Sequence, residues 1–339
     1  MSNERMKLAF STLGCPDWDI TRIAETARRL GYDGVELRAV GGSVDLLSSR
    51  EFTAKEIGKT KAYFEEHGVE ICCVDTSCTF HSSDSGERAA QVELALAHAE
   101  LGAQLGTPLI RVFPDKIQPG ANREETRDFI AESLHHIAQR MPAGIQVGLE
   151  THGDYARTET ASEIVMLADH RQVKLIWDVA NSLAAGDSIR HAARVVEPHL
   201  AHVHLRDARP TTSSEHWLPV LAGCGSVSFA ETLAVLETLN YDGYVSFEWE
   251  KYWHPEIEEP EVALPDFMNA IRKLRSDTLS QKSEVALDRV STARGSGCVD
   301  VQQSILPRIL DSEGLTHPLP RAVLTRSNRI SRLLRETAK

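Results

Sequence analysis

Short apolar runs alternate along the chain with longer segments in which apolar residues recur every three or four positions. The first kind is typical of buried parallel strands, and the second of amphipathic helices packed on one face. The sequence therefore predicts strands over 7–12, 33–39, 69–77, 108–113, 145–150, 173–178, 201–207 and 243–250. The predicted helices lie over 19–31, 54–68, 87–106, 123–141, 160–169, 186–196, 229–240 and 263–274.

Eight strands, each followed by a helix, are the pattern of a parallel barrel. We therefore expect an α/β protein with a (β/α)8 TIM barrel over residues 1–275. The alternative is an open, doubly wound sheet, in which a glycine-rich phosphate turn would follow the first strand. Here that turn reads TLGCPDWD and has no GxGxxG spacing, which favours the barrel.

Residues 276–339 break the alternation of strands and helices. They include the stretch STARGSG, carry more basic than acidic side chains and contain no clear strand. We expect an irregular C-terminal extension that is partly disordered, with an arm that mediates oligomer formation as the alternative.

The composition of the 339 residues narrows the class of protein. With 42% hydrophobic and 25% charged residues the chain is typical of globular proteins, and its formal net charge of −12 argues against nucleic acid as a partner. No apolar run approaches the roughly 20 residues that span a bilayer, and the start MSNERMKLAF has no apolar signal stretch. The six cysteines form no CxxC pair, so we expect reduced thiols in a cytoplasmic protein with no membrane partner.

The candidate chemistry lies at the ends of the last four predicted strands. These strands end with or carry Glu150, Asp178, His204 and Glu248. In barrels of this kind the active site lies at the carboxyl ends of the strands, so the four side chains should meet. Three carboxylates gathered in a low-dielectric mouth would repel one another unless a cation held them. We therefore predict a divalent-metal site, for which oxygen ligands and one imidazole favour Mn²⁺, with Mg²⁺, Co²⁺ or Zn²⁺ as alternatives.

Two histidines lie on the predicted strand over 201–207. Residues two apart point to the same side of a strand, so His202 and His204 both face the interior, and His204 is nearer the mouth. We assign His204 as the ligand. His202 is either a residue of the barrel interior or a hydrogen-bond partner within the site.

Further polar residues near strand ends are candidates for substrate binding. Glu36 and Arg38 form either an interior ion pair or substrate contacts, and Arg111 presents the same two alternatives. Arg206 follows His204 and could clamp a hydroxyl, carboxylate or phosphate oxygen. The long loop over 208–225 could act as a lid.

The segments LETHGD, WDVANSLAAGD, HVHLRD and YDGYVSFEWE, together with YDGVELR and LGTPLIRVF, resemble the xylose isomerase-like barrel superfamily, the sugar-phosphate isomerase/epimerase group. The resemblance covers residues 6–275. It implies a Mn²⁺-type site formed by Glu150, Asp178, His204 and Glu248. In the ketose epimerases of this group the two glutamates also remove and return a proton beside a carbonyl, through a cis-enediolate.

The sequence departs from the ketose epimerases at Asn181, where those enzymes commonly have a histidine. Endonuclease IV, another member, also uses a histidine there, so Asn181 counts against a nuclease, and we assign Asn181 to the substrate contacts. His152, two residues after Glu150, is common in the group. It is either a substrate hydrogen-bond donor or an additional catalytic acid/base, or else a structural loop residue.

The function that we expect is a metal-dependent isomerase or epimerase acting on a small sugar or sugar derivative. The alternative is a lyase or dehydratase that uses the same site on a keto-sugar, cyclitol or 3-keto-glycoside. An endonuclease IV-like nuclease and a non-catalytic barrel are the remaining hypotheses. We also expect a homo-oligomer.

Overall fold

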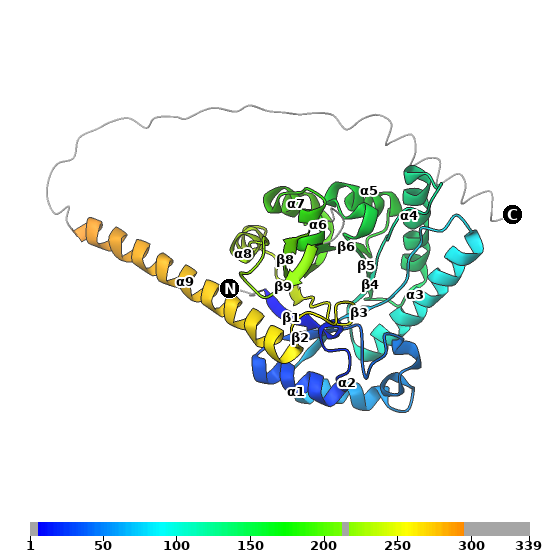
Figure 1. Ribbon diagram of the computed structural model, residues 1–339, viewed down its shortest axis with the longest axis horizontal. Coiled ribbons are helices and arrows are strands. Elements are labelled where there is room, and N and C mark those ends of the chain that lie inside the picture. Colours follow the sequence, from blue (N-terminus) through cyan, green and yellow to red (C-terminus); the bar gives the residue numbers. More distant parts are fainter. Residues whose placement is uncertain (1–5, 212–216, 295–339) are drawn as a thin grey trace. The chain divides into compact units, whose positions relative to one another are not determined.

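The computed structural model describes residues 6–211 and 217–294. Within them eight parallel strands close into a barrel in the order β1-β10-β7-β6-β5-β4-β3-β2, and the helices lie outside this ring (Figure 1). The predicted (β/α)8 barrel is confirmed. Its strands are β1 (Lys7–Ser11), β2 (Gly34–Leu37), β3 (Glu70–Asp75), β4 (Leu109–Val112), β5 (Gln146–Glu150), β6 (Val173–Asp178), β7 (Leu200–His204) and β10 (Tyr244–Phe247).

The helices begin and end at residues whose chemistry explains their limits. The side chains of Asp19, Asp84 and Asn122 accept backbone N–H groups at helix starts, and Gly31 ends a helix in the left-handed conformation at φ 82°. The helices are α1 (Ile20–Leu30), α2 (Ile57–Glu66), α3 (Ser85–Leu105), α4 (Arg123–Arg140), α5 (Thr158–Ala168), α6 (Val179–Ala184), α7 (Ile189–Val196), α8 (Phe229–Thr238) and α9 (Pro260–Arg294).

Several loops contain short 3-10 helices. They are η1 (Thr12–Gly14), η2 (Leu46–Ser48), η3 (Arg50–Phe52), η4 (Gly153–Tyr155) and η5 (Glu197–His199). Buried apolar side chains from the strands and the inner faces of the helices form an extensive core, and a smaller cluster of strand residues consists of Ala9, Cys72, Cys73, Leu109 and Ile176. Among the described residues, no helix is long and apolar enough to cross a membrane.

The sequence interpretation missed α6 and placed the end of the last helix too early. Helix α6 starts directly after Asp178, where only a helix near 186–196 was expected. The closing helix was expected over 263–274, but α9 continues to Arg294, so the chain is still helical where we expected it to become irregular. The sequence DTLSQKSEVALDRV explains this, because it contains no glycine or proline that would end a helix. Residues 295–339 lie outside the described residues.

Backbone contacts divide the chain into two units, Met1–Ser276 and Asp277–Lys339, and the site described below belongs to the first. The assignment of 1–275 as the barrel domain and 276–339 as an extension of it stays a prediction.

A hairpin occupies the segment in which the sequence suggested the end of a strand and a lid loop. The strand expected over 201–207 ends at His204, and Asp207 begins a new strand, β8 (Asp207–Pro210), which pairs antiparallel with β9 (Trp217–Val220). The carboxylate of Asp207 accepts the backbone N–H groups of Ala208, Gly225 and Val227 at 2.8 to 3.0 Å. Asp207 thus fastens the start of the hairpin to the segment that leads into α8.

We expect Gly225→Ala to destabilise the protein, because a Cβ at this position would lie 2.2 Å from Oδ1 of Asp207 and 2.5 Å from the carbonyl oxygen of Ala208. Overpacking of this kind costs about 1–3 kcal/mol of unfolding free energy, which thermal melts would show as a lower Tm. Gly58→Ala is the matched control, because nothing lies within 4 Å of that Cβ and alanine favours helix α2. An unchanged Tm for Gly225→Ala would contradict this account of the hairpin anchor.

Candidate active site at the carboxyl end of the barrel

Glu150, Asp178, His204 and Glu248 meet at one end of the barrel. The first three are the last residues of β5, β6 and β7, and Glu248 directly follows β10. One ligand atom from each side chain lies within 4.8 Å of those of the other three, and all four residues are buried. The structure therefore brings together the four residues that the sequence selected.

The register of the strands explains how four strand ends reach one level. Asp178 pairs with His204, whereas Glu150 pairs with Ile176 and His204 pairs with Ser246. Asp178 therefore lies two positions beyond the residue that pairs with Glu150, His204 pairs directly with Asp178, and Glu248 lies two positions beyond the residue that pairs with His204. Strands of an eight-stranded barrel with a shear of about 8 are staggered by about one residue per strand, so these residues share nearly the same height.

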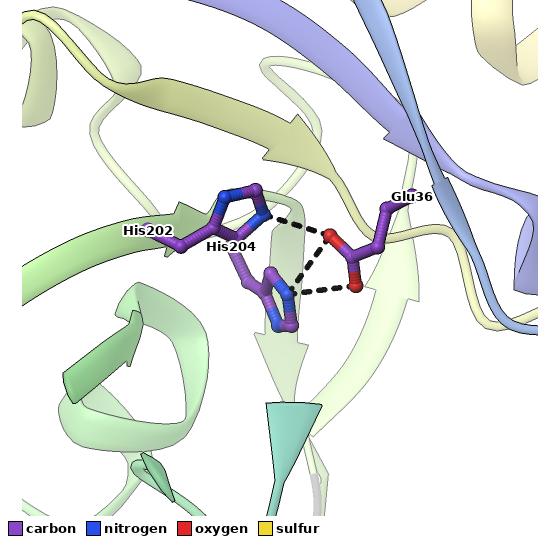
Figure 2. A group of neighbouring side chains, drawn as sticks. All are labelled: Glu36, His202 and His204. Atoms are coloured by element: carbon purple, nitrogen blue, oxygen red, sulfur yellow. Dashed lines mark hydrogen bonds and ion pairs between the residues drawn. The ribbon is translucent and has the colours of Figure 1, made fainter. Parts of the chain in front are cut away.

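Glu36 on β2, which is separated from β7 by β10 and β1 in the barrel, fixes the orientation of the His204 ring (Figure 2). His204 Nε2 lies 3.0 Å from Glu36 Oε1, and His202 Nε2 lies 2.8 Å from Glu36 Oε2. His204 Nδ1 lies 3.3 Å from Glu248 and 3.8 Å from Glu150, and this buried atom has no hydrogen-bond partner. Although burial opposes it, Glu248 and Glu36 raise the pKa of His204 and so favour its protonated ring, whereas the neutral ring that donates its Nε2 proton to Glu36 presents the lone pair of Nδ1 to the site, as metal-binding histidines do.

Glu36 therefore has a role that sequence reasoning missed. It does not form the ion pair with Arg38 that was one alternative, because Arg38 donates to Val44 O and Ser77 Oγ. His202 is a hydrogen-bond partner within the site through Glu36, which was the second of its two alternatives. The signal that could have found Glu36 is its place at the end of β2, but the distance across the barrel to β7 is not visible in a sequence. Substrate contacts by Glu36 and Arg38 stay predictions.

Two buried arginines bind the carboxylates of the site. Arg206 Nη1 donates to Asp178 Oδ2 at 2.5 Å and to Glu248 Oε2 at 2.9 Å. Arg111 Nη1 donates to Glu150 Oε2 at 2.5 Å, and its Nε lies 3.4 Å from Asp75. These contacts make both arginines local counter-charges, and the substrate contacts predicted for them stay predictions.

The charges of the site shift the pKa values of its carboxyl groups in opposite directions. Burial raises the pKa of Asp178 to about 7, with Arg206 acting against this rise and Glu248 adding to it. Burial also disfavours ionisation of Glu150, but Arg111 and His204 outweigh it and hold the pKa of Glu150 well below its usual range. Likewise, burial disfavours ionisation of Glu36, and the charge of His204 with hydrogen bonds from both histidines holds its pKa low. The direction of each shift thus depends on whether nearby cations and hydrogen bonds outweigh burial and the neighbouring acids.

Asn181 links the start of α6 to the site. Asp178 caps this helix by accepting the backbone N–H of Asn181 at 2.8 Å, which fixes one carboxylate oxygen and leaves the other facing Arg206. The Asn181 side chain donates to Thr151 O and accepts from Arg206 Nη2, both at 3.2 Å. Asn181 therefore positions Arg206, and its predicted contact with substrate stays a prediction.

A cavity of about 520 Å³ opens beside these residues, and its polar lining residues are Lys116, His152, Asp154, Asn181, Arg206, Glu250 and His254. The ring of His152 packs on Phe113 with 5.1 Å between ring centroids, and its Nδ1 is buried without a hydrogen-bond partner. The cavity has the size of a small-molecule site. His152 is thus placed where a ligand could receive its hydrogen bond, although the role predicted for it stays a prediction.

The residues of the site fit a divalent metal ion. Three carboxylates and the unpartnered Nδ1 of His204 converge from separate strands, and Glu36 holds the imidazole from behind. Oxygen ligands with one imidazole suit divalent ions such as Mn²⁺ or Zn²⁺, and a ligand histidine fixed by a carboxylate is a common feature of such sites.

Comparisons with known proteins agree with this fold. The structure of a D-tagatose 3-epimerase-like protein superposes with a TM-score of 0.65 at 21% identity, covering 82% of this chain and 100% of that one. The structure of the IOLI protein, which holds a zinc atom, superposes with a TM-score of 0.66 at 19% identity, covering 81% and 99%.

Among curated proteins, inosose dehydratase of Bacillus anthracis is 24% identical over 153 residues, which are 40% of this chain and 51% of that enzyme. The chain thus spans about half the length of the curated relatives that it matches. The family model described as "Xylose isomerase-like TIM barrel" matches residues 24–274, which include every residue of the site. The chain therefore belongs to the xylose isomerase-like TIM barrel family.

Proposed function

We propose that the protein is a metal-dependent isomerase or epimerase that moves a proton at a carbon beside the carbonyl group of a small sugar or sugar derivative. The observation that supports this most is the convergence of Glu150, Asp178, His204 and Glu248 around the unpartnered His204 Nδ1. Relatives named for epimerase and dehydratase activity support the substrate class.

The positions of the two glutamates suit the proton transfer. In the barrel, β6 and β7 separate β5, which carries Glu150, from β10, which precedes Glu248. The two carboxylates thus approach the site from different sides, so one can remove a proton and the other can return it on the opposite face. Against the effect of burial, Arg111 holds Glu150 in place and, with His204, lowers its pKa. His204 and, to a smaller extent, Arg206 lower the pKa of Glu248. A bound divalent ion would supply the positive charge that stabilises the oxygen anion forming on the substrate.

The second candidate is a lyase that removes a proton in the same way and then expels a β-hydroxyl group or a glycosidic oxygen. His152 favours it, because its ring lines the cavity and its buried Nδ1 has no partner, so it could protonate a leaving oxygen. The curated inosose dehydratase is a relative with this type of name.

Mn²⁺ is the ion that we propose, and the zinc atom in the IOLI protein makes Zn²⁺ the alternative. A cytoplasmic location, a homo-oligomeric state and the absence of a nucleic-acid partner stay predictions from the sequence.

Incubation with Mn²⁺ and a panel of keto-sugars and cyclitol ketones in D2O tests the proposal. We expect mass spectrometry to show solvent deuterium in one sugar and in an isomer of the same formula, and a chelator to abolish the exchange. Loss of water or of an aglycone would favour the lyase instead. The absence of both exchange and elimination with every sugar would contradict the proposed chemistry.

A further inference from the structure

Asp75 ends β3 in the barrel interior, beside Glu36 on the neighbouring strand β2. The register pairs Glu36 with Cys73, and Asp75 lies two residues beyond Cys73, so the three side chains point to the same side of the sheet. The side chains of Asp75 and Glu36 are in hydrogen-bonding contact, and both residues are fully buried. No step of the proposed proton transfer uses Asp75, although it contacts the carboxylate that orients His204.

The Glu36 carboxylate uses only one of its oxygens for the hydrogen bonds with the two histidines (Figure 2). Its Oε2 is hydrogen-bonded to His202 Nε2 at 2.8 Å and to His204 Nε2 at 3.2 Å. Its Oε1 lies 3.0 Å from His204 Nε2 but is a buried atom without a hydrogen-bond partner. Because a buried charged acceptor is costly to leave unpaired, Oε1 needs a donor from another residue.

The two oxygens of Asp75 also differ. Cys73 Sγ donates to Asp75 Oδ1 at 3.4 Å, and Arg111 Nε lies 3.4 Å from the same oxygen without forming a hydrogen bond. Oδ2 is buried and has no hydrogen-bond partner. Arg111 donates from Nη1 to Glu150 instead. Arg111 therefore does not supply Asp75 with a hydrogen-bonded counter-charge.

One proton satisfies both unpartnered oxygens. Ionised carboxylates only accept hydrogen bonds, whereas a protonated carboxyl group beside a carboxylate can donate to it. Burial raises the pKa of Asp75 well above its usual range, the charge of Glu36 adds to the rise, and Arg111 opposes it. The two histidines outweigh burial at Glu36 and hold its pKa low. Two acids whose pKa values are moved apart in this way divide the roles of donor and acceptor, and the proton lies on Asp75.

We propose that Asp75 is a positioning residue of the site, a neutral acid that donates a hydrogen bond to Glu36 and thereby fixes the carboxylate that orients His204. The inference rests on the proposed function in one respect, because it takes His204 as a metal ligand. An ion pair between Asp75 and Arg111 is the competing role, and it requires an ionised Asp75. The two roles respond differently to asparagine, which keeps the hydrogen bond but not the charge.

Two substitutions at Asp75 test the hydrogen bond through metal affinity, measured by isothermal titration calorimetry with Mn²⁺. The amide of asparagine has the shape of a protonated carboxyl group and can donate to Glu36, so Asp75→Asn should stay within about threefold of the wild-type Kd. Leucine has the same branching but no donor, so Asp75→Leu should weaken binding about 10–100-fold. Glu70→Gln, which removes an exposed acid from the other end of β3, is the control and should bind like the wild type.

Two outcomes of this titration would overturn the proposal. Equal weakening in Asp75→Asn and Asp75→Leu would show that Asp75 acts as an anion. Wild-type affinity in Asp75→Leu would show that Asp75 positions nothing.

Infrared spectroscopy tests the proton itself without metal or substrate, and it needs only the conservative variant to fold. In D2O, at a pH at which exposed acids are ionised, the wild-type spectrum minus that of Asp75→Asn should show the C=O band of one protonated carboxyl group. The same difference with Glu70→Gln should not show it, and absence of the band for Asp75 would overturn the proposal.

Failure of the proposed function has a different signature. The band without Mn²⁺ uptake would support the neutral acid and reject the metal centre. Mn²⁺ uptake that is weakened by Asp75→Leu, without deuterium exchange in any sugar, would support the positioning role and reject the isomerase.

Discussion

Glu150→Gln and Glu248→Gln should each abolish turnover of the sugar identified by deuterium exchange. Glutamine preserves the size of the side chain and can still accept a hydrogen bond from Arg111 or Arg206 through its amide oxygen. It cannot take up a proton, so the step at the carbon beside the carbonyl loses its base or its acid. General acid–base catalysis contributes about 10²–10⁴-fold, and we expect kcat to fall by at least that much.

The comparison must separate proton transfer from metal binding, because both glutamates are also candidate ligands. Metal content by mass spectrometry after dialysis should stay at half or more of the wild-type value in both variants, since Asp178, His204 and the remaining glutamate are unchanged. Glu237→Gln on the exposed face of α8 is the control and should retain full turnover. Undiminished kcat in both site variants would reject the mechanism with two bases.

The four candidate ligands could be selected from the sequence because three of them end a strand and Glu248 directly follows one. Barrel strands run in the same direction, so residues at their carboxyl ends meet whatever the details of packing. Alternation places His202 and His204 on the same side of β7, and the position of His204 nearer the carboxyl end was the reason to prefer it as the candidate ligand. Neighbouring strands are staggered, so two residues that pair do not lie at the same height in the barrel. This stagger is small and did not affect the selection of the four candidate ligands.

The partners of these residues could not be found in the same way. Glu36 and His204 lie on β2 and β7, which are separated in the barrel by β1 and β10, so their contact depends on barrel closure. The contacts of Arg206 with Asp178, Glu248 and Asn181 depend on the direction of a long, flexible side chain. Contacts between particular side chains can be identified only from coordinates, whereas the ends of strands can be predicted from the periodicity of apolar residues in the sequence.

One missed element did carry a local signal. Helix α6 follows Asp178 directly, and an aspartate before a run such as VANSLA is a common helix start. The sequence interpretation treated Asp178 only as a candidate ligand and overlooked its capping role. The hairpin β8–β9 was missed for another reason, since only four residues form each of its strands and Pro210 and Pro219 interrupt the pattern.

His204→Ala should remove the metal ion, whereas His202→Ala should only weaken its binding. His204 Nδ1 faces Glu150 and Glu248, so its loss removes one of four candidate ligands. His202 hydrogen-bonds to Glu36 and packs edge-on against the His204 ring, and loss of such an outer partner typically lowers metal affinity about 10–100-fold. After dialysis against buffer without metal, His204→Ala should retain less than about a tenth of the wild-type Mn²⁺.

Titration with Mn²⁺ followed by thermal melts provides a second measurement that is independent of turnover. Ligands that bind only the folded state raise the Tm, so the wild-type protein should be stabilised by the ion, His202→Ala should need higher concentrations and His204→Ala should not respond. The melt without metal shows whether either variant is destabilised in itself. Equal metal loss in the two variants would show that the two histidines do not have the different roles proposed here. Full metal content in His204→Ala would show that His204 is not a ligand. With His204 confirmed, Glu36 would be the residue that presents Nδ1 to the ion, because it is the carboxylate that both histidines share.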